Sequence, residues 1–477
     1  MNTRRTLAFS ALFLATALLV GSCGGGGGGS AGAPSAGDPA VTSEADSILH
    51  MDQLRAAGFR GAGVRVGVIS TGVVYLATYQ SAGLLPQNIY IVQNTPGMLD
   101  EGSWMLELVH QYAPDAVLGF CDGFDLDFHS CLMDLANNFH ADVIVDDLLF
   151  YGQFNPDATA YDIGQLEAAN DKLVFIHLSG NEQVGGFWQG KFEITPLLLA
   201  GTPVSALDFG VASGAASDPF ESVSLPPADH LALFVSWNDP PHGVANHVLT
   251  AYLLDDSQQV ITQASGQVEP SVRLDYINTT GVAQGVHLAV SLDAGGTADG
   301  LAVEVTQSYR TCNIDCLPLT YATSGLAGGI VGDFPDALVV GSTGTLAPYP
   351  VDPWSNQGPV RIDFAAMPDA AMPDGFSYTR LASPLMIQKP DLVAPDCVHV
   401  PFSNGVTLFS NTFCGTSAAV PGIAGAAALL ESAGFNRSRV LKALRSTAVR
   451  YPGAAAWDPA SGAGLADAIA AWKSGGN

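Results

Sequence analysis

Residues 413–425 read FCGTSAAVPGIAG, and small and apolar residues continue through Leu430. A helix that is apolar on every side is expected to run through a core. Ser417 lies where this helix would begin, and the unpaired amide groups and the helix dipole favour negative charge at that end. The stretch therefore predicts a buried helix that presents a serine suited to acyl transfer. The alternative is an ordinary buried helix with a capping serine or threonine.

Matching segments elsewhere favour the first interpretation. The run around Ser417 resembles the G-T-S-x-A-x-P motif of the subtilisin-like serine proteases. Residues 388–395 (QKPDLVAP) resemble the K-P-D-V-x-A-P segment of that family, and residues 354–359 (WSNQGP) resemble its S-x-x-G-P. Residues 64–73 (VRVGVISTGV) are similar to its first core strand, which ends in the catalytic aspartate. Residues 462–468 resemble its closing G-x-G-x-x-D-A. The resemblance implies an α/β fold with a parallel sheet flanked by helices, and hydrolysis of polypeptides.

Composition limits the class of protein. The chain has 477 residues, enough for two or three domains with ample core. Its 45 acidic residues against 18 Lys and Arg give a formal net charge of −27. A nucleic-acid-binding protein would carry the opposite charge, so we expect no nucleic-acid partner.

The N-terminus resembles a bacterial lipoprotein signal. Residues 1–22 combine a basic start with an apolar stretch that is too short for a stable membrane span. Small residues then precede Cys23, which in such signals receives lipid after cleavage. The Gly-, Ser-, Ala- and Pro-rich residues 23–44 form a flexible tether. We expect an exported protein, lipid-anchored in the bacterial cell envelope; a plain secretory signal with an incidental Cys23 is the alternative.

The remaining cysteines suggest disulfides, because an even number is typical of exported proteins. They are Cys121, Cys131, Cys312, Cys316, Cys397 and Cys414. Sequence proximity favours the pairs 121–131 and 312–316, which leaves 397–414 to staple the loop before Ser417. A zinc site at 312–316 is the competing interpretation, but no nearby ligand completes it.

Strand-like apolar runs alternate with helical patterns over residues 45–204 and 309–475, which predicts βαβ units and a parallel sheet. Residues 205–308 break this rhythm. Short apolar runs separated by turn residues predict an inserted, jelly-roll-like β-sandwich there. The sandwich could position substrate, or it could only pack and solubilise the protein.

Acyl transfer also needs an oxyanion donor and a base. Ser179-Gly180-Asn181 follows the apolar run 173–178 and resembles the A-G-N of the family, so Asn181 is the predicted oxyanion donor. A simple turn asparagine is the alternative.

The residue at the position of the catalytic base differs from the histidine of the family. Residues 113–116 (APDA) match the A-P-x-A after the family's catalytic helix, and this register places Glu101 at the catalytic histidine. An apolar stripe from Met105 lies on the same helical face. The related sedolisins use a glutamate here, with an aspartate four residues later, where this chain has Met105. We expect Glu101 to act as the base.

Ser70 lies at the position where the family has its catalytic aspartate. Another acid must therefore support Glu101. Asp147, after the run 143–145, and Asp100 are the candidates; solvated acids at a turn are the alternative for Asp147. Two nearby carboxylates share a proton, which raises one pKa. We expect the pKa of Glu101 to be raised. We also expect the rising limb of the pH–activity profile to lie below pH 6.

These features predict a serine endopeptidase with a polypeptide substrate and no cofactor required for the chemistry. Metal ligands are undetermined, and a structural calcium lacks support because the pattern after Asp122 has no glycine where a calcium loop needs one. An inactive pseudoprotease that binds peptides is the main alternative, and an adhesion or glycan-binding role for the sandwich is a third.

Overall fold

The computed structural model describes residues 42–94, 100–123, 128–149, 158–182, 185–240, 246–266, 270–293, 296–309, 318–323, 337–372, 375–400 and 412–475. The proposed signal, Cys23 and most of the tether lie outside these residues, as do Cys312 and Cys316. No helix within the described part is long and apolar enough to cross a membrane.

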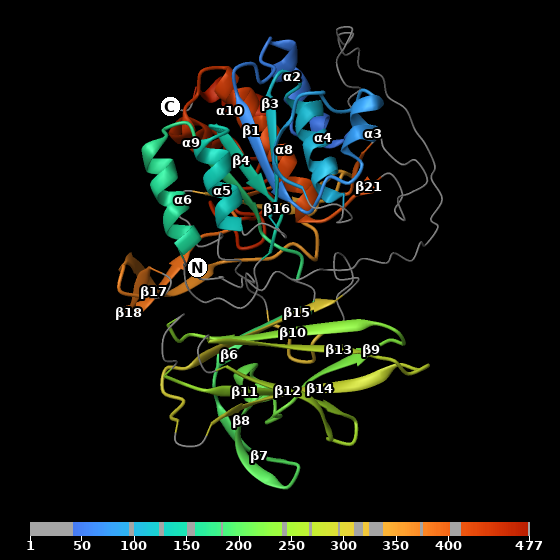
Figure 1. Cartoon of the computed structure of the whole chain (residues 1–477), viewed down its shortest axis with the longest axis vertical. Helices are drawn as coiled ribbons and strands as arrows, with labels where there is room; N and C mark the ends of the chain where they lie inside the picture. Colours follow the sequence, from blue (N-terminus) through green and yellow to red (C-terminus); the bar gives the residue numbers. More distant parts are fainter. Residues whose placement is uncertain are drawn as a thin grey trace.

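A seven-stranded parallel sheet forms the centre of the larger domain (Figure 1). Its order is β19-β16-β5-β4-β1-β3-β2. The strands are β1 (Arg65–Ser70), β2 (Tyr90–Gln93), β3 (Val117–Asp122), β4 (Val143–Asp146), β5 (Val174–Leu178), β16 (Leu338–Thr343) and β19 (Leu392–Pro395). Continuous apolar runs form the inner strands because both faces of a parallel sheet are covered.

Helices cover the two faces of this sheet. One face packs against α4 (Glu101–Tyr112) and α8 (Thr416–Ser432), and the other against α5 (Phe128–Asn137) and α6 (Ala158–Ala169). Every residue of α8 from Thr416 to Glu431 is buried, as the small and apolar sequence predicted. This arrangement confirms the predicted α/β class.

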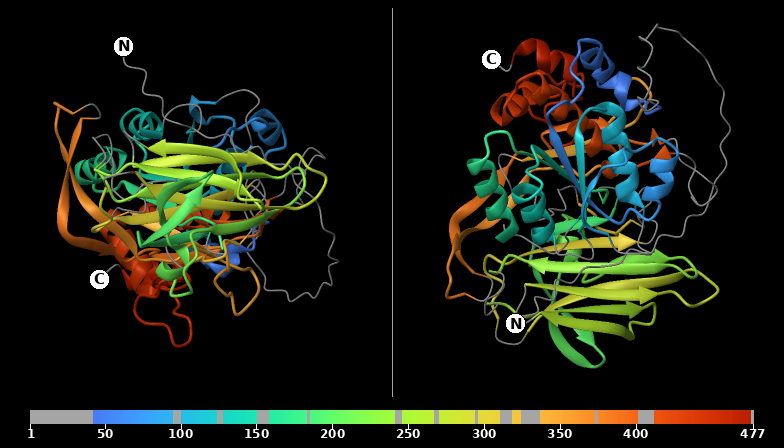
Figure 2. Two further views of the ribbon diagram at one scale, coloured as in Figure 1. Left: turned by 90° about the horizontal axis from the view of Figure 1, so that it is seen from below. Right: turned by 45° about the horizontal axis from the view of Figure 1, so that its top comes forward.

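The second domain is a β-sandwich that lies beside the larger one (Figures 1 and 2). One sheet has the order β13-β10-β15-β6 and the other β12-β11-β14-β8-β7, with β9 pairing β14. The strands are β6 (Phe187–Lys191), β7 (Ile194–Leu199), β8 (Thr202–Leu207), β9 (Glu221–Leu225), β10 (His230–Trp237), β11 (Leu249–Asp255), β12 (Val260–Gly266), β13 (Ser271–Ile277), β14 (Gln284–Leu292) and β15 (Ala302–Tyr309). Because β6 belongs to it, the sandwich takes in residues before the expected start at 205.

Smaller elements occupy the rest of the described residues. They are α1 (Ala45–Ile48), α2 (Met51–Ala56), α3 (Leu76–Ser81), α7 (Phe209–Ala212), α9 (Arg437–Thr447), α10 (Ala468–Ser474), the ribbon β17 (Val360–Pro368) with β18 (Phe376–Ile387), and the pair β20 (Val398–His399) with β21 (Thr412–Phe413). The first strand of the sandwich, β6, follows β5 in the chain order. The carboxyl edge of the central sheet therefore faces the sandwich (Figure 1).

Two of the three predicted disulfides fall on described residues, and both are present. They join Cys121 to Cys131 and Cys397 to Cys414. The second one ties the end of β19 to the start of α8, as the sequence predicted. The pair 312–316 lies outside the described residues.

Candidate active site

The predicted nucleophile lies at the start of α8. Gly415 precedes the helix with φ 93°, a conformation that favours glycine. Its amide donates to the Asp396 carboxylate at 2.9 Å. Ser417 follows as the second helical residue and is 7% exposed. Its N–H is among the first amides of the helix, which have no acceptor within it, so this amide is placed to donate to an oxyanion that forms beside the hydroxyl.

Asn181 contacts this helix start from the loop after β5. Its Oδ1 accepts from the Thr416 amide and the Thr416 hydroxyl, each at 2.9 Å. A backbone N–H can only donate, so these bonds fix which end of the Asn181 amide is oxygen. The Nδ2 amino group is left as the donor end, close to Gly415. The structure thus brings Asn181 and Ser417 together.

A pair that sequence reasoning missed holds the Asn181 loop. Glu182 accepts from the Asn181 amide at 2.9 Å and from Asn356 Nδ2 at 2.7 Å, while Asn356 Oδ1 accepts from the Glu182 amide at 2.8 Å. Asn356 also donates its own amide to the Gly180 carbonyl at 3.0 Å. Asn356 belongs to the S-x-x-G-P-like segment, so the signal was present in the sequence. Its partner lies 174 residues away.

Glu101 begins α4 and reaches Ser417 from the facing side. The next residue, Gly102, donates its amide to the Thr71 carbonyl at 2.9 Å, which ties the helix start to the end of β1. A Cβ on Gly102 would lie 2.4 Å from the Phe120 ring and 2.8 Å from the Gly72 carbonyl oxygen. Only glycine fits there, so the close approach of helix and strand fixes the position of Glu101.

The electrostatics of Glu101 suit a base. Burial raises the pKa of Glu101 to about 7, and hydrogen bonding with Ser417 and Asp147 opposes that rise. Burial and the charge of Glu101 raise the pKa of Asp147 well above its usual range, against the effect of the nearby Ser70 hydroxyl. Among the described residues neither Asp147 oxygen has a partner in ordinary hydrogen-bond geometry. Burial and the proximity of the two carboxyl groups thus favour the protonated form of both acids.

Strand alternation decides which acid faces the site. Ile69 pairs with Asp146 across β1 and β4, so Ser70 lies beside Asp147 just past the end of β4. Val145 packs on the face covered by α4 and α8, and Asp147, two residues on, lies toward the same face. The small Ser70 leaves room there for the Asp147 carboxyl group.

Asp146 points to the opposite face. Its carboxylate pairs with His177 Nδ1 at 2.9 Å, and both side chains are almost completely buried. These residues occupy paired positions on β4 and β5. His177 lies within β5 and is buried, so it is a core residue of the sheet. The sheet thus separates this imidazole from Ser417.

Asp100 is engaged elsewhere. One of its oxygens accepts from the Tyr75 amide at 3.0 Å and from the Ser103 hydroxyl at 2.7 Å. These contacts join the start of α4 to α3. Of the two candidate acids, Asp147 is the one that the geometry places against Glu101.

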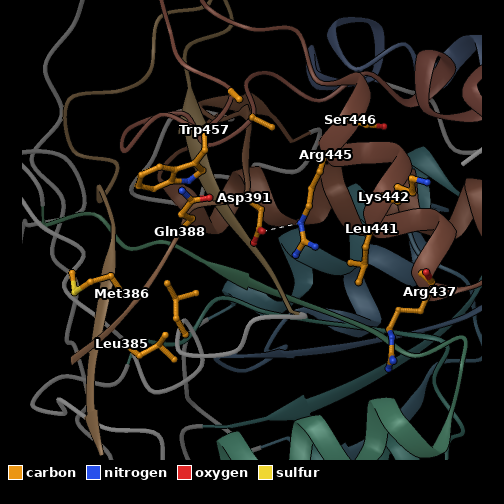
Figure 3. Close-up of a pocket in the computed structure, with 14 residues that line it drawn as sticks. Leu385, Met386, Gln388, Asp391, Arg437, Leu441, Lys442, Arg445, Ser446 and Trp457 are labelled. Atoms are coloured by element: carbon orange, nitrogen blue, oxygen red, sulfur yellow. Dashed lines mark hydrogen bonds and ion pairs between the residues drawn. The ribbon is translucent and has the colours of Figure 1, made fainter. Parts of the chain in front are cut away.

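A groove of about 990 Å³ lies away from these residues, between the end of β18 and α9 (Figure 3). At its side Asp391 bonds Arg445 at 2.8 Å and the buried Lys389 at 2.8 Å. Asp391 also accepts from the Val339 amide at 2.7 Å. The K-P-D segment therefore anchors β19 to β16 and α9. Its contribution to the site is structural.

No cluster of three or more potential metal ligands occurs within the described ranges. The groups gathered around Ser417 are a hydroxyl, an amide and two carboxyls. This set can transfer a proton and stabilise an oxyanion.

Comparison with known proteins identifies the fold. No protein-family model matches the chain, and no curated protein does. Among solved structures, the CspB protease of Clostridium perfringens matches with a TM-score of 0.53 and 14% identity, over 90% of this chain and 98% of that one. The prenylagaramide maturation protease PagA (TM-score 0.44, 13% identity, 89% and 97% covered) and a lanthipeptide protease (0.43, 14%, 90% and 94%) also match. We base the comparison on the first: the chain has a subtilisin-like fold.

Proposed function

We propose that this protein is a serine endopeptidase in which Ser417, Glu101 and Asp147 form the catalytic triad. The observation that carries the proposal is the convergence of Ser417, Asn181 and a Glu101 whose pKa is raised to about 7. A base with a pKa near the working pH is half-ionised there, which is where general-base catalysis is effective. The subtilisin-like fold supports a polypeptide substrate.

In the first half of the reaction, the Ser417 oxygen attacks the peptide carbonyl carbon and its proton passes to Glu101. The carbonyl oxygen becomes an oxyanion, held by Asn181 Nδ2 and the Ser417 amide. The tetrahedral intermediate collapses when the C–N bond breaks and Glu101 returns the proton to the leaving amine. Ser417 is then left as an acyl ester.

In the second half, Glu101 takes a proton from a water molecule that attacks the ester. Collapse of the second intermediate returns this proton to the Ser417 oxygen and releases the acid. Throughout, a protonated Asp147 donates to Glu101 and stabilises its charged form. In a Ser-His-Asp triad, by contrast, the acid stays ionised and accepts a hydrogen bond from the base. The buried pair carries at most one negative charge, which avoids the cost of two.

The test is phosphonylation by a fluorophosphonate probe, with the labelled residue identified by mass spectrometry. We expect label on Ser417, and loss of both labelling and peptidase activity in Ser417→Ala. Ser446→Ala, an exposed serine on α9, is the matched control and should label normally. An unlabelled wild-type Ser417 between pH 4 and 9 would favour the inactive, peptide-binding alternative.

We also propose that the protein acts from the bacterial cell envelope, anchored by lipid on Cys23. The support is the signal-like segment that ends at Cys23. The tether would let the domain reach polypeptides near the membrane.

A further inference from the structure

Asp396 lies directly behind the nucleophile loop, at the end of β19. Its Oδ2 accepts from the Gly415 amide at 2.9 Å and from Trp354 Nε1 at 3.2 Å. Its own amide donates to the Thr343 carbonyl at 2.9 Å. Asp396 is fully buried, so these bonds fix it in the sheet and fix Gly415 to it.

The Asp396–Gly415 hydrogen bond is the first of three consecutive links between two chain segments. The Cys397–Cys414 disulfide comes next, followed by the pairing of Val398 with Phe413. Together the three links connect the residues after β19 to the segment that precedes α8. The Asp396–Gly415 hydrogen bond is the link nearest to Ser417.

A second buried acid, Asp352, faces Asp396. Within the described chain, Asp396 Oδ1 and Asp352 Oδ2 each lack a hydrogen-bond donor, and neither carboxyl forms an ion pair with a Lys, Arg or His side chain. Ser342 and Tyr451 also lie near Asp352. The Tyr451 hydroxyl donates to the Tyr349 carbonyl at 2.6 Å. A proton held between the two carboxyls is the donor that both need.

Burial and the adjacent Asp352 raise the pKa of Asp396 to about 9. Below that pH, the pair holds at least one proton, and Oδ2 remains on the Gly415 amide. Above it, two carboxylates face each other in a buried place where the described residues supply no cation. Their repulsion is relieved only if one of them moves.

We propose that Asp396 is a positioning residue for Ser417, and that the proton it shares with Asp352 holds the nucleophile loop in place up to an alkaline limit. The inference rests on the proposed function for its effect on catalysis. Its effect on the Gly415 amide is independent of catalysis.

The experiment uses the full chain and two variants. Asp352→Asn replaces the shared proton with a permanent amide donor, so labelling of Ser417 should persist at pH 10, where wild-type labelling falls. Asp396→Ala removes the acceptor of the Gly415 amide and should slow labelling by about 10–100-fold at every pH, the cost of a misplaced reacting group. Asp115→Asn, an exposed acid paired with Arg60, is the control and should follow wild type.

Hydrogen exchange provides the readout that does not need activity. The protection factor of a peptide containing Gly415 should fall between pH 8 and 10 in wild type and stay constant in Asp352→Asn. An unchanged alkaline limb in Asp352→Asn, with equal protection in both proteins, overturns the proposal; a purely structural role or a limit set by Asp147 gives that result. The expected exchange difference without any labelling would instead overturn the proposed function and leave the positioning role standing.

Discussion

The pH dependence of labelling tests Glu101 most directly. With a pKa of about 7, only about 1% of Glu101 is ionised at pH 5 and about 10% at pH 6. The second-order rate of Ser417 phosphonylation should therefore fall tenfold per pH unit below 7, to about 100-fold below its plateau at pH 5. The sequence alone suggested a limb below pH 6. Burial of the carboxyl group moves the expected limb upward.

The variant Glu101→Gln keeps the shape of the side chain and removes the base. We expect a loss of at least ~100-fold at the plateau, the low end for general-base catalysis, and loss of the limb. Glu193→Gln, at an exposed position in the turn between β6 and β7, is the control and should behave as wild type.

Temperature distinguishes a carboxyl base from an imidazole. Carboxylic acids ionise with little enthalpy, so a limb set by Glu101 should stay in place on warming, whereas a limb set by histidine should move to lower pH. A limb near pH 7 that survives in Glu101→Gln, and that shifts on warming, would refute the assignment of Glu101.

Four further outcomes follow from the geometry. Asp147→Asn keeps a hydrogen-bond donor to Glu101, so the rising limb of the labelling profile should stay near its wild-type pH. Asp147→Ala removes a hydrogen bond that lowers the pKa of Glu101, so the limb should move to higher pH. Asn181→Leu should slow peptide hydrolysis by about 10²–10³-fold, the usual cost of one oxyanion donor, with the circular dichroism spectrum unchanged. Gly102→Ala should lower stability by about 1–3 kcal/mol, measured by denaturant unfolding, because its Cβ would overlap an aromatic ring at 2.4 Å. Mass spectrometry of the mature protein should find lipid on an N-terminal Cys23; a soluble form with unmodified Cys23 would contradict the anchor.

Much of the fold was readable from the sequence because its signals are local. The run after Ser417 specifies a buried helix through composition alone, and alternating apolar runs specify the parallel sheet. Two disulfides followed from the spacing of cysteines. The sandwich was predicted from short strands and turns, but its first strands were not, since β6 and β7 directly follow the Asn181 loop and carry no distinct boundary.

The sequence also determined which residues could do the chemistry. Ser417, Asn181 and Glu101 occupy positions that motif order and helix register assign, and the structure brings all three together. It could not choose between Asp100 and Asp147, because both are acids near the ends of predicted elements.

Tertiary structure made that choice through strand register and burial. The alternation of β4 sends Asp146 to His177 on one face and Asp147 toward Glu101 on the other. The Asn356–Glu182 bracket and the Asp352–Asp396 pair join residues that are distant in the sequence, so no local pattern could reveal them. The pKa of a carboxyl group depends on which other charges share its burial. That property exists only once the chain has folded.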